Sequence, residues 1–64
     1  MGKIQVFKTQ TFFGKRFYFR VKAENGETIA VSEAYNSKQA CMDGISSLIA
    51  NVNDSTEIVD LTTK

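Results

Sequence analysis

Residues 16–23 read RFYFRVKA, and the alternation of side chains in this stretch decides the fold. Phe17, Phe19 and Val21 occupy every second position, and the residues between them are basic or carry a phenol group. A helix would distribute these side chains around its circumference, whereas an extended chain separates them onto two faces. The stretch therefore predicts a β-strand whose apolar face lies in a core.

A second strand is predicted upstream, over residues 3–9, where Ile4 and Val6 fall on one face. A loop around residues 10–15 joins it to the strand at 16–23, and Gly14 breaks the alternating pattern there.

A third strand is predicted over residues 28–32, after the turn Glu24-Asn25-Gly26-Glu27. A two-residue turn centred on Asn-Gly would place Val21 opposite Ala30 and send the apolar residues of the two strands to opposite faces.

A three-residue loop with Gly26 in a left-handed conformation is the alternative for this turn. It pairs Val21 with Ile29 and Phe19 with Val31, which gathers four apolar side chains on one face. It also keeps the two glutamates of the turn from facing each other. We therefore predict the second register.

One helix is predicted over residues 37–51, where apolar residues recur at helical spacing and form one stripe. Ser37 is a suitable N-cap, and Gly44 and Ala40 are small enough to allow close packing on the sheet. The stripe consists of Cys41, Ile45, Leu48, Ile49 and Val52.

A short fourth strand is predicted over residues 57–61, which contain Ile58, Val59 and Leu61. The order β-β-β-α-β predicts an α+β fold, with an antiparallel three-stranded sheet and one helix across its apolar face. A chain of 64 residues has room for one core, so residues 1–64 are expected to form a single unit.

The sequence resembles the YegP-like family of small uncharacterised bacterial and archaeal proteins, although Ala34 stands where that family more often has Gly. The resemblance implies a β3-α-β unit that occurs as a tandem repeat or as two chains that exchange C-terminal strands, and it implies no established activity. It rests on Phe19-Arg20-Val21-Lys22-Ala23, Asn25-Gly26-Glu27, Ile29, Ser32-Glu33-Ala34-Tyr35, Ser37-Lys38, Cys41, Gly44-Ile45 and Val59-Asp60-Leu61-Thr62.

Burial and ordering nearly cancel in a chain of this length, and one Cys allows no internal disulfide. Association with a second copy is the usual remaining source of stability. We therefore expect a homodimer in which the 57–61 strand is exchanged, with Ile58, Val59 and Leu61 at the interface.

Charge is distributed unevenly, because residues 1–22 hold six cations and no acid, whereas residues 23–64 hold seven acids and two lysines. The two parts therefore carry +6 and −5. Such asymmetry is typical of a nucleic-acid surface, or of two parts that lie against each other and offset their charges.

The polar side of the 16–23 strand is the candidate nucleic-acid face, with Arg16, Tyr18, Arg20 and Lys22. Phe7 lies beside Tyr18 if paired residue numbers in the first hairpin sum to 25. Rings that stack on bases and cations that follow a backbone are found in binders of single strands. The alternative is a solvated face on which the aliphatic parts of the lysine and arginine side chains cover the rings of Tyr18 and Phe7.

The start of the helix is the candidate anion site, with Tyr35, Ser37 and Lys38 near free backbone N–H groups. The alternative is that Ser37 caps the helix and Tyr35 packs over the sheet edge. Cys41 belongs to the apolar stripe, so we expect a buried, inert thiol.

The chain has no His, and its carboxylates are not spaced with partners that would give an acid–base pair. Its apolar stretches are too short to cross a membrane, and a lone Cys fits a reducing cytoplasm. We expect a non-enzymatic, homodimeric, cytoplasmic module of unknown molecular role, without cofactor, metal or membrane partner. Weak single-stranded nucleic-acid binding is the alternative function.

Overall fold

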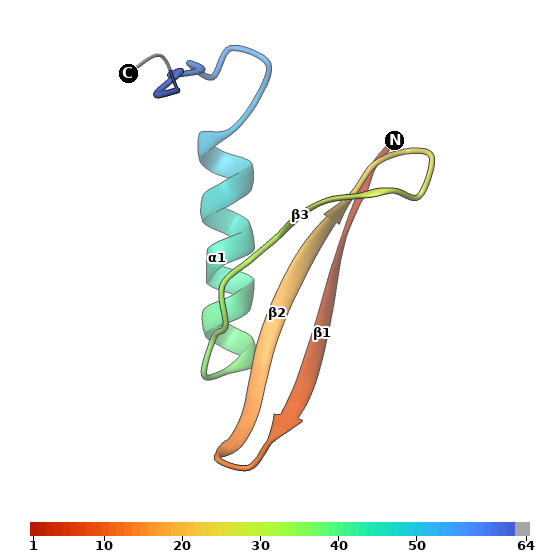
Figure 1. Cartoon of the computed structure of the whole chain (residues 1–64), viewed down its shortest axis with the longest axis vertical. Helices are drawn as coiled ribbons and strands as arrows, with labels where there is room; N and C mark the ends of the chain where they lie inside the picture. Colours follow the sequence, from red (N-terminus) through yellow and green to blue (C-terminus); the bar gives the residue numbers. More distant parts are fainter. Residues whose placement is uncertain (63–64) are drawn as a thin grey trace.

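The computed structural model describes residues 1–62, and the elements within them follow the order β1, β2, β3, α1. The strands form one antiparallel sheet in that spatial order, and α1 packs against β2 (Figure 1). The α+β prediction is confirmed, and the last two residues of the predicted unit 1–64 lie outside the described part. The bounds are β1 Lys3–Thr11, β2 Gly14–Lys22, β3 Thr28–Val31 and α1 Lys38–Asn51.

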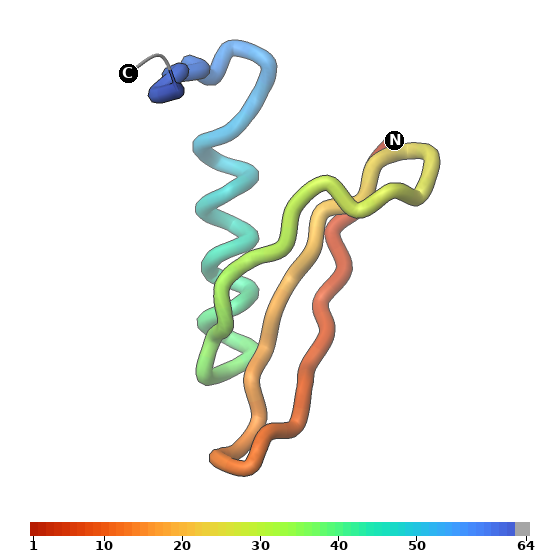
Figure 2. The backbone as a smooth tube through the Cα atoms, in the orientation of Figure 1, coloured from red at the N-terminus to blue at the C-terminus, as the bar shows by residue number. Residues whose placement is uncertain are grey.

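β1 and β2 form a long hairpin in which paired residue numbers sum to 25, so the predicted pairing of Phe7 with Tyr18 is confirmed (Figure 2). Side chains directly opposite each other in such a pair share a face. The face toward α1, here called the inner face, carries Ile4, Val6, Phe17, Phe19 and Val21, and the outer face carries Gln5, Phe7, Arg16, Tyr18, Arg20 and Lys22.

The turn of this hairpin is shorter than the predicted loop around residues 10–15, because Phe12 and Phe13 alone separate the paired residues Thr11 and Gly14. The Thr11 hydroxyl donates to the Gly14 carbonyl oxygen at 2.6 Å and accepts from the Phe13 amide at 3.2 Å. Gly14 has a φ of 125°, which residues with a Cβ rarely adopt. These features allow the strands to continue up to the tip.

The turn between β2 and β3 has the predicted three-residue loop. The Ala23 amide donates to the Glu27 carbonyl at 2.7 Å, and Gly26 adopts a φ of 89°. The Asn25 side chain accepts from the Glu27 amide at 3.0 Å, which further fixes the loop.

The predicted pairing beyond this turn is wrong by one residue, because a β-bulge follows the turn. Ser32 helps to fix the observed register, since its hydroxyl accepts from the Phe19 amide at 2.9 Å and its amide donates to the Phe19 carbonyl at 2.8 Å. Val31 therefore shares the outer face with Arg20. The structure pairs Val21 with Ala30 and Arg20 with Val31, where the sequence predicted Val21 with Ile29 and Phe19 with Val31.

α1 begins after Ser37, whose hydroxyl accepts from the Ala40 amide at 3.0 Å, so the predicted helix and its N-cap are confirmed. The predicted close approach at Gly44 is also confirmed. A Cβ atom added there would lie 2.8 Å from Cζ of Tyr35, and closer still to the Tyr35 hydroxyl.

The buried core lies between β2 and the first half of α1, where Phe19 is 8% exposed and Cys41 is fully buried. Tyr35 covers this region, because its ring stacks on Phe19 with centroids 6.3 Å apart. Its backbone pairs with Phe17 through two hydrogen bonds of 2.8 and 2.9 Å. The β3–α1 connection is thus tied to the sheet immediately before the helix starts.

The predicted fourth strand is not formed in the single chain, where residues 57–61 are irregular. Ile58, Val59 and Leu61 are exposed there. The segment lies on the side of α1 away from the hairpin (Figure 1). Its exchange with a second chain stays a prediction.

Candidate functional site

The outer face brings together the aromatic and basic residues that the sequence singled out. Tyr18 stacks on Phe7, with ring centroids 5.3 Å apart and planes 11° from parallel. The guanidinium carbon of Arg20 lies 4.7 Å from the Phe7 centroid. Arg16 and Lys22 extend the same face along β2, and all four predicted residues are half-buried.

The cations of this face have neutral hydrogen-bond partners. Arg20 Nε donates to Gln5 Oε1 at 2.9 Å, and Lys22 Nζ donates to Thr28 Oγ1 at 3.1 Å. Within residues 1–62, the one ion pair found joins the Met1 amino group to a Glu24 oxygen at 3.0 Å. The outer face therefore keeps its positive charge, which attracts a polyanion.

The aromatic part of the outer face is already engaged by its neighbours. Phe7 offers its ring to both Tyr18 and Arg20, so a stacking base would have to displace one of them. Tyr18 is the other half of this stack, so one face of its ring is engaged as well. The contacts also agree with the alternative of a solvated face whose stems cover the rings.

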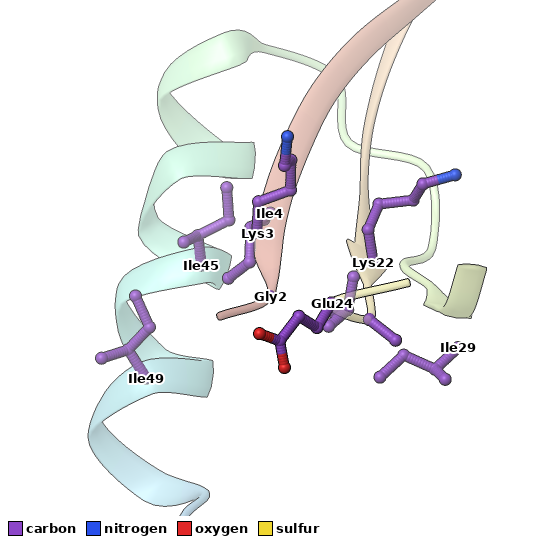
Figure 3. Close-up of a pocket in the computed structure, with 10 residues that line it drawn as sticks. Gly2, Lys3, Ile4, Lys22, Glu24, Ile29, Ile45 and Ile49 are labelled. Atoms are coloured by element: carbon purple, nitrogen blue, oxygen red, sulfur yellow. The ribbon is translucent and has the colours of Figure 1, made fainter. Parts of the chain in front are cut away.

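The inner side of the sheet holds an open apolar groove of about 590 Å³ beside the second half of α1 (Figure 3). Ile45 and Ile49 of α1 form one wall, and Ile29 lies on the other side. Ile4 and Val21 of the hairpin also line it. We call this cavity the inner groove, and no segment among residues 1–62 fills it.

The start of α1 holds the predicted anion-site residues, but two of them already have structural partners. The Ser37 hydroxyl caps the helix, and Tyr35 is turned onto Phe19 and Gly44. Lys38 lines a smaller hollow of about 330 Å³ together with Lys8, among others. The arrangement agrees with the alternative in which these residues cap and cover the fold.

Cys41 is fully buried among the core side chains, as the sequence predicted. Burial raises the pKa of its thiol, because the thiolate would lose its hydration. A raised pKa and a lack of access both reduce nucleophilic reactivity.

Asp60 organises the backbone of the exposed C-terminal segment. It accepts hydrogen bonds from the Thr62 hydroxyl at 2.6 Å and the Thr62 amide at 2.9 Å. These bonds stabilise the carboxylate and lower the pKa of Asp60. Its neighbours Ile58, Val59 and Leu61, the predicted interface residues, lie 92%, 63% and 77% exposed.

Phe12 and Phe13 form a feature that the sequence interpretation missed. They stand at the tip of the β1–β2 hairpin, 95% and 84% exposed, with their rings edge to face. Two consecutive phenylalanines directly before a turn glycine were the available signal, because a two-residue turn leaves such side chains no core to enter.

The described part of the chain offers neither a metal-ligand cluster nor a membrane-spanning helix. Residues 1–62 contain no group of three or more His, Cys, Asp or Glu side chains that could hold a metal ion. None of their helices is long and apolar enough to cross a membrane.

The fold and its surfaces define a class of protein: a small α+β domain with a basic outer face and an open apolar groove inside. The family described as "Domain of unknown function (DUF1508)" matches residues 14–60. The chain belongs to this family, which is the YegP-like family that its sequence resembles.

Two relatives match most of the chain. A "UPF0339 protein" of Treponema denticola is 47% identical over 53 residues, which cover 83% of this chain and 86% of that relative. A "UPF0339 protein" of Methanosarcina acetivorans is 37% identical over 59 residues, which cover 92% of this chain and 97% of that relative. No solved structure matches the chain.

A third relative is longer. The "UPF0339 protein in ptx operon 5'region" of Stutzerimonas stutzeri is 45% identical over 38 residues, which cover 59% of this chain and 34% of that protein. The family therefore includes chains of more than one length.

Proposed function

We propose that the chain is a non-enzymatic, homodimeric module of the cytoplasm, in which residues 57–61 of each copy complete the sheet and the core of the other. Ile58, Val59 and Leu61 form the interface. One observation carries the proposal. The chain leaves the inner groove open, and it also leaves the apolar segment 57–61 exposed.

The dimensions of the single chain support this proposal. Its accessible surface is 5398 Å², whereas a compact monomer of 7.1 kDa exposes about 4,100 Å². Its radius of gyration is 14.0 Å, whereas about 11 Å is typical of 64 residues. The excess of about 1,300 Å² is larger than the area of about 800 Å² that each partner buries in a standard interface.

The longer relative gives separate support. An alignment of 38 residues makes up 34% of it, so it is about 110 residues long, nearly twice the length of this chain. One such chain has room for two units, which is the covalent equivalent of the dimer.

Charge also favours exchange between copies. Glu57 and Asp60 belong to the acidic part of the chain, and residues 1–22 carry six cations without an acid. An exchanged segment would bring the acidic part of one copy toward the basic part of the other, which favours assembly at low ionic strength.

The test replaces Val59 with Asp and measures molar mass by sedimentation equilibrium. A charge forced into a shared core costs several kcal/mol, so Val59→Asp is expected to sediment as a monomer and to lose most of its stability. Deletion of residues 56–64, the last two of which lie outside the described residues, is expected to do the same.

Ser46→Asp is the matched control, because it adds the same charge at an exposed position of α1 and is expected to leave the dimer intact. A Val59→Asp chain that sediments as the unchanged dimer, or a parent chain that is a monomer, would overturn the proposal.

A second candidate function is weak binding of single-stranded nucleic acid by the outer face. The observation that favours it is the cluster of Tyr18, Arg20 and Lys22 beside Phe7, whose cations have no carboxylate partner among the described residues. Titration of labelled single-stranded RNA at two salt concentrations tests it.

The expected result is binding at low salt that weakens when Arg16, Arg20 and Lys22 are replaced by Gln, with a flatter salt dependence. Tyr18→Ala should weaken binding by about 1–3 kcal/mol through lost stacking. Replacing Lys8, Lys15 and Lys38 by Gln removes the same charge elsewhere and serves as the control. No binding by the parent chain at low salt would remove this candidate.

A further inference from the structure

The tip of the β1–β2 hairpin is an exposed apolar point on a rigid support. Phe12 and Phe13 are almost fully exposed, and their rings pack edge to face with centroids 5.2 Å apart. The tip lies at the far end of the hairpin from the N-terminus (Figure 1). Exposed aromatic side chains in contact with each other mark an interaction site more strongly than scattered ones.

The tip is also organised before any partner binds. The Thr11 hydroxyl accepts from the Phe13 amide and donates to the Gly14 carbonyl, so the turn is closed by its own side chain. Ladder pairs continue up to Thr11 and Gly14. A preformed tip loses little conformational entropy when it binds, which favours affinity.

Cations surround the tip on both faces of the hairpin. Lys15 lies opposite Gln10 and Lys8 opposite Phe17, so both lysines share the inner face. Arg16 belongs to the outer face. All three lie within four residues of the tip, and the first 23 residues contain no acid.

Five of the seven acidic residues of the described chain gather at the opposite end, whereas Glu33 precedes α1 and Asp43 stands in its first half. Glu24 and Glu27 stand in the β2–β3 turn, and Asp54, Glu57 and Asp60 follow the end of α1. Figure 1 shows both segments at the end away from the hairpin tip. Charge is therefore polarised along the molecule, and an anionic surface would orient it with the tip forward.

We propose that the hairpin tip docks on the surface of a membrane that contains anionic phospholipids, with Phe12 and Phe13 at the level of the headgroups. Aromatic residues favour this interface, and each nearby Lys or Arg strengthens attraction to anionic lipids. The expectation of no membrane partner rested on the lack of a crossing segment, which contact at the membrane surface does not require.

The distribution of charge favours a membrane over a nucleic acid. A single-stranded nucleic acid would follow one face of the sheet, whereas the cations near the tip divide between the two faces. A planar anionic surface meets both faces of a hairpin that points into it. The tip also offers an apolar end, which a lipid interface accepts without a complementary groove.

The test uses the full chain with a tryptophan placed at the tip, because the sequence has no other Trp. Phe13→Trp is expected to show blue-shifted emission with vesicles of phosphatidylcholine and phosphatidylglycerol. It should show no shift with phosphatidylcholine alone. Co-sedimentation of the parent chain with the same two vesicle types measures binding without the label.

Variants of the tip separate insertion from general attraction. Phe12→Ser with Phe13→Ser should weaken binding at least about ten-fold and leave the melting temperature unchanged, because both side chains are exposed. Lys8→Gln with Lys15→Gln should weaken it about five-fold per cation. Lys3→Gln with Lys22→Gln, at the other end of the hairpin, is the matched control and should have a smaller effect.

Three results with vesicles would overturn the proposal. The first is no binding of the parent chain to the anionic vesicles at low salt. The second is undiminished binding by the double Phe variant. The third is a loss of binding in the control with Lys3→Gln and Lys22→Gln that equals the loss with Lys8→Gln and Lys15→Gln. Binding of single-stranded RNA that depends on Phe12 and Phe13 while vesicle binding does not would also overturn it.

Discussion

The space between the sheet and α1 has a closed half and an open half. Near the start of α1, Phe19 and Cys41 are buried beneath Tyr35. Near its end, Ile49 is 65% exposed and Ile29 is 63% exposed. Side chains of the same chemistry line both halves, so the difference lies in the cover. An apolar pattern in a sequence shows what a fold must bury, and the single chain buries only part of it.

The largest expected effect is in the closed half. Phe19→Ala should destabilise the protein by about 3–5 kcal/mol, because it removes a buried ring and leaves a cavity. For so small a domain this is comparable to its whole stability. Urea unfolding followed by circular dichroism measures the loss. A change below about 1 kcal/mol would show that Phe19 is not in the core.

A substitution in the open half tests whether a second copy covers the inner groove. If a second copy covers the inner groove, Ile49→Ala should cost about 2–4 kcal/mol in the dimer, as at other buried positions. If the groove stays in water, the same change should cost less than about 0.5 kcal/mol. An exchanged dimer predicts the larger value, measured by urea unfolding at a concentration where the dimer is populated.

Close packing in the closed half predicts a smaller effect. Gly44→Ala places a Cβ against the Tyr35 ring and should cost about 1–2 kcal/mol, although alanine favours a helix. The cost should fall in a Tyr35→Phe background, because the hydroxyl nearest to the new Cβ is gone. An equal cost in both backgrounds would contradict this contact.

The change in stability expected at Cys41 is as small as that at Gly44. Cys41→Ala should cost about 1–2 kcal/mol and leave the oligomer intact. Since burial raises the pKa of the thiol, a thiol reagent near neutral pH should react slowly with the native chain and quickly in denaturant. Fast labelling of the native chain would contradict the core assignment.

The three strands of the sheet, the helix and the first hairpin could be predicted from the sequence because their patterns are local, whereas the strand predicted over residues 57–61 is not formed in the single chain. Alternation over residues 16–23 fixed a strand, and the spacing from Cys41 to Val52 fixed a helix. The pairing of Phe7 with Tyr18 was predicted only on the condition that paired residue numbers sum to 25, and the structure meets that condition. The outer face was therefore predictable by residue before its contacts were known.

The register of β2 with β3 could not be predicted in this way, because a bulge inserts one residue without changing the local pattern. The three-residue loop at Gly26 is correct, but the ladder beyond it follows Ser32 and Phe19. The exposed tip was missed because residues 10–15 were interpreted as a loop. Phe12 and Phe13 looked like loop residues, and only the tight turn at Gly14 shows that they project from the fold.

Exchange between copies is tested by the melting temperature of the parent chain over a wide range of protein concentrations. If each copy completes the other, dissociation accompanies unfolding, and the melting temperature should rise by about 4 °C for each tenfold increase in concentration. A melting temperature independent of concentration, together with the molar mass of a monomer, would contradict the claim.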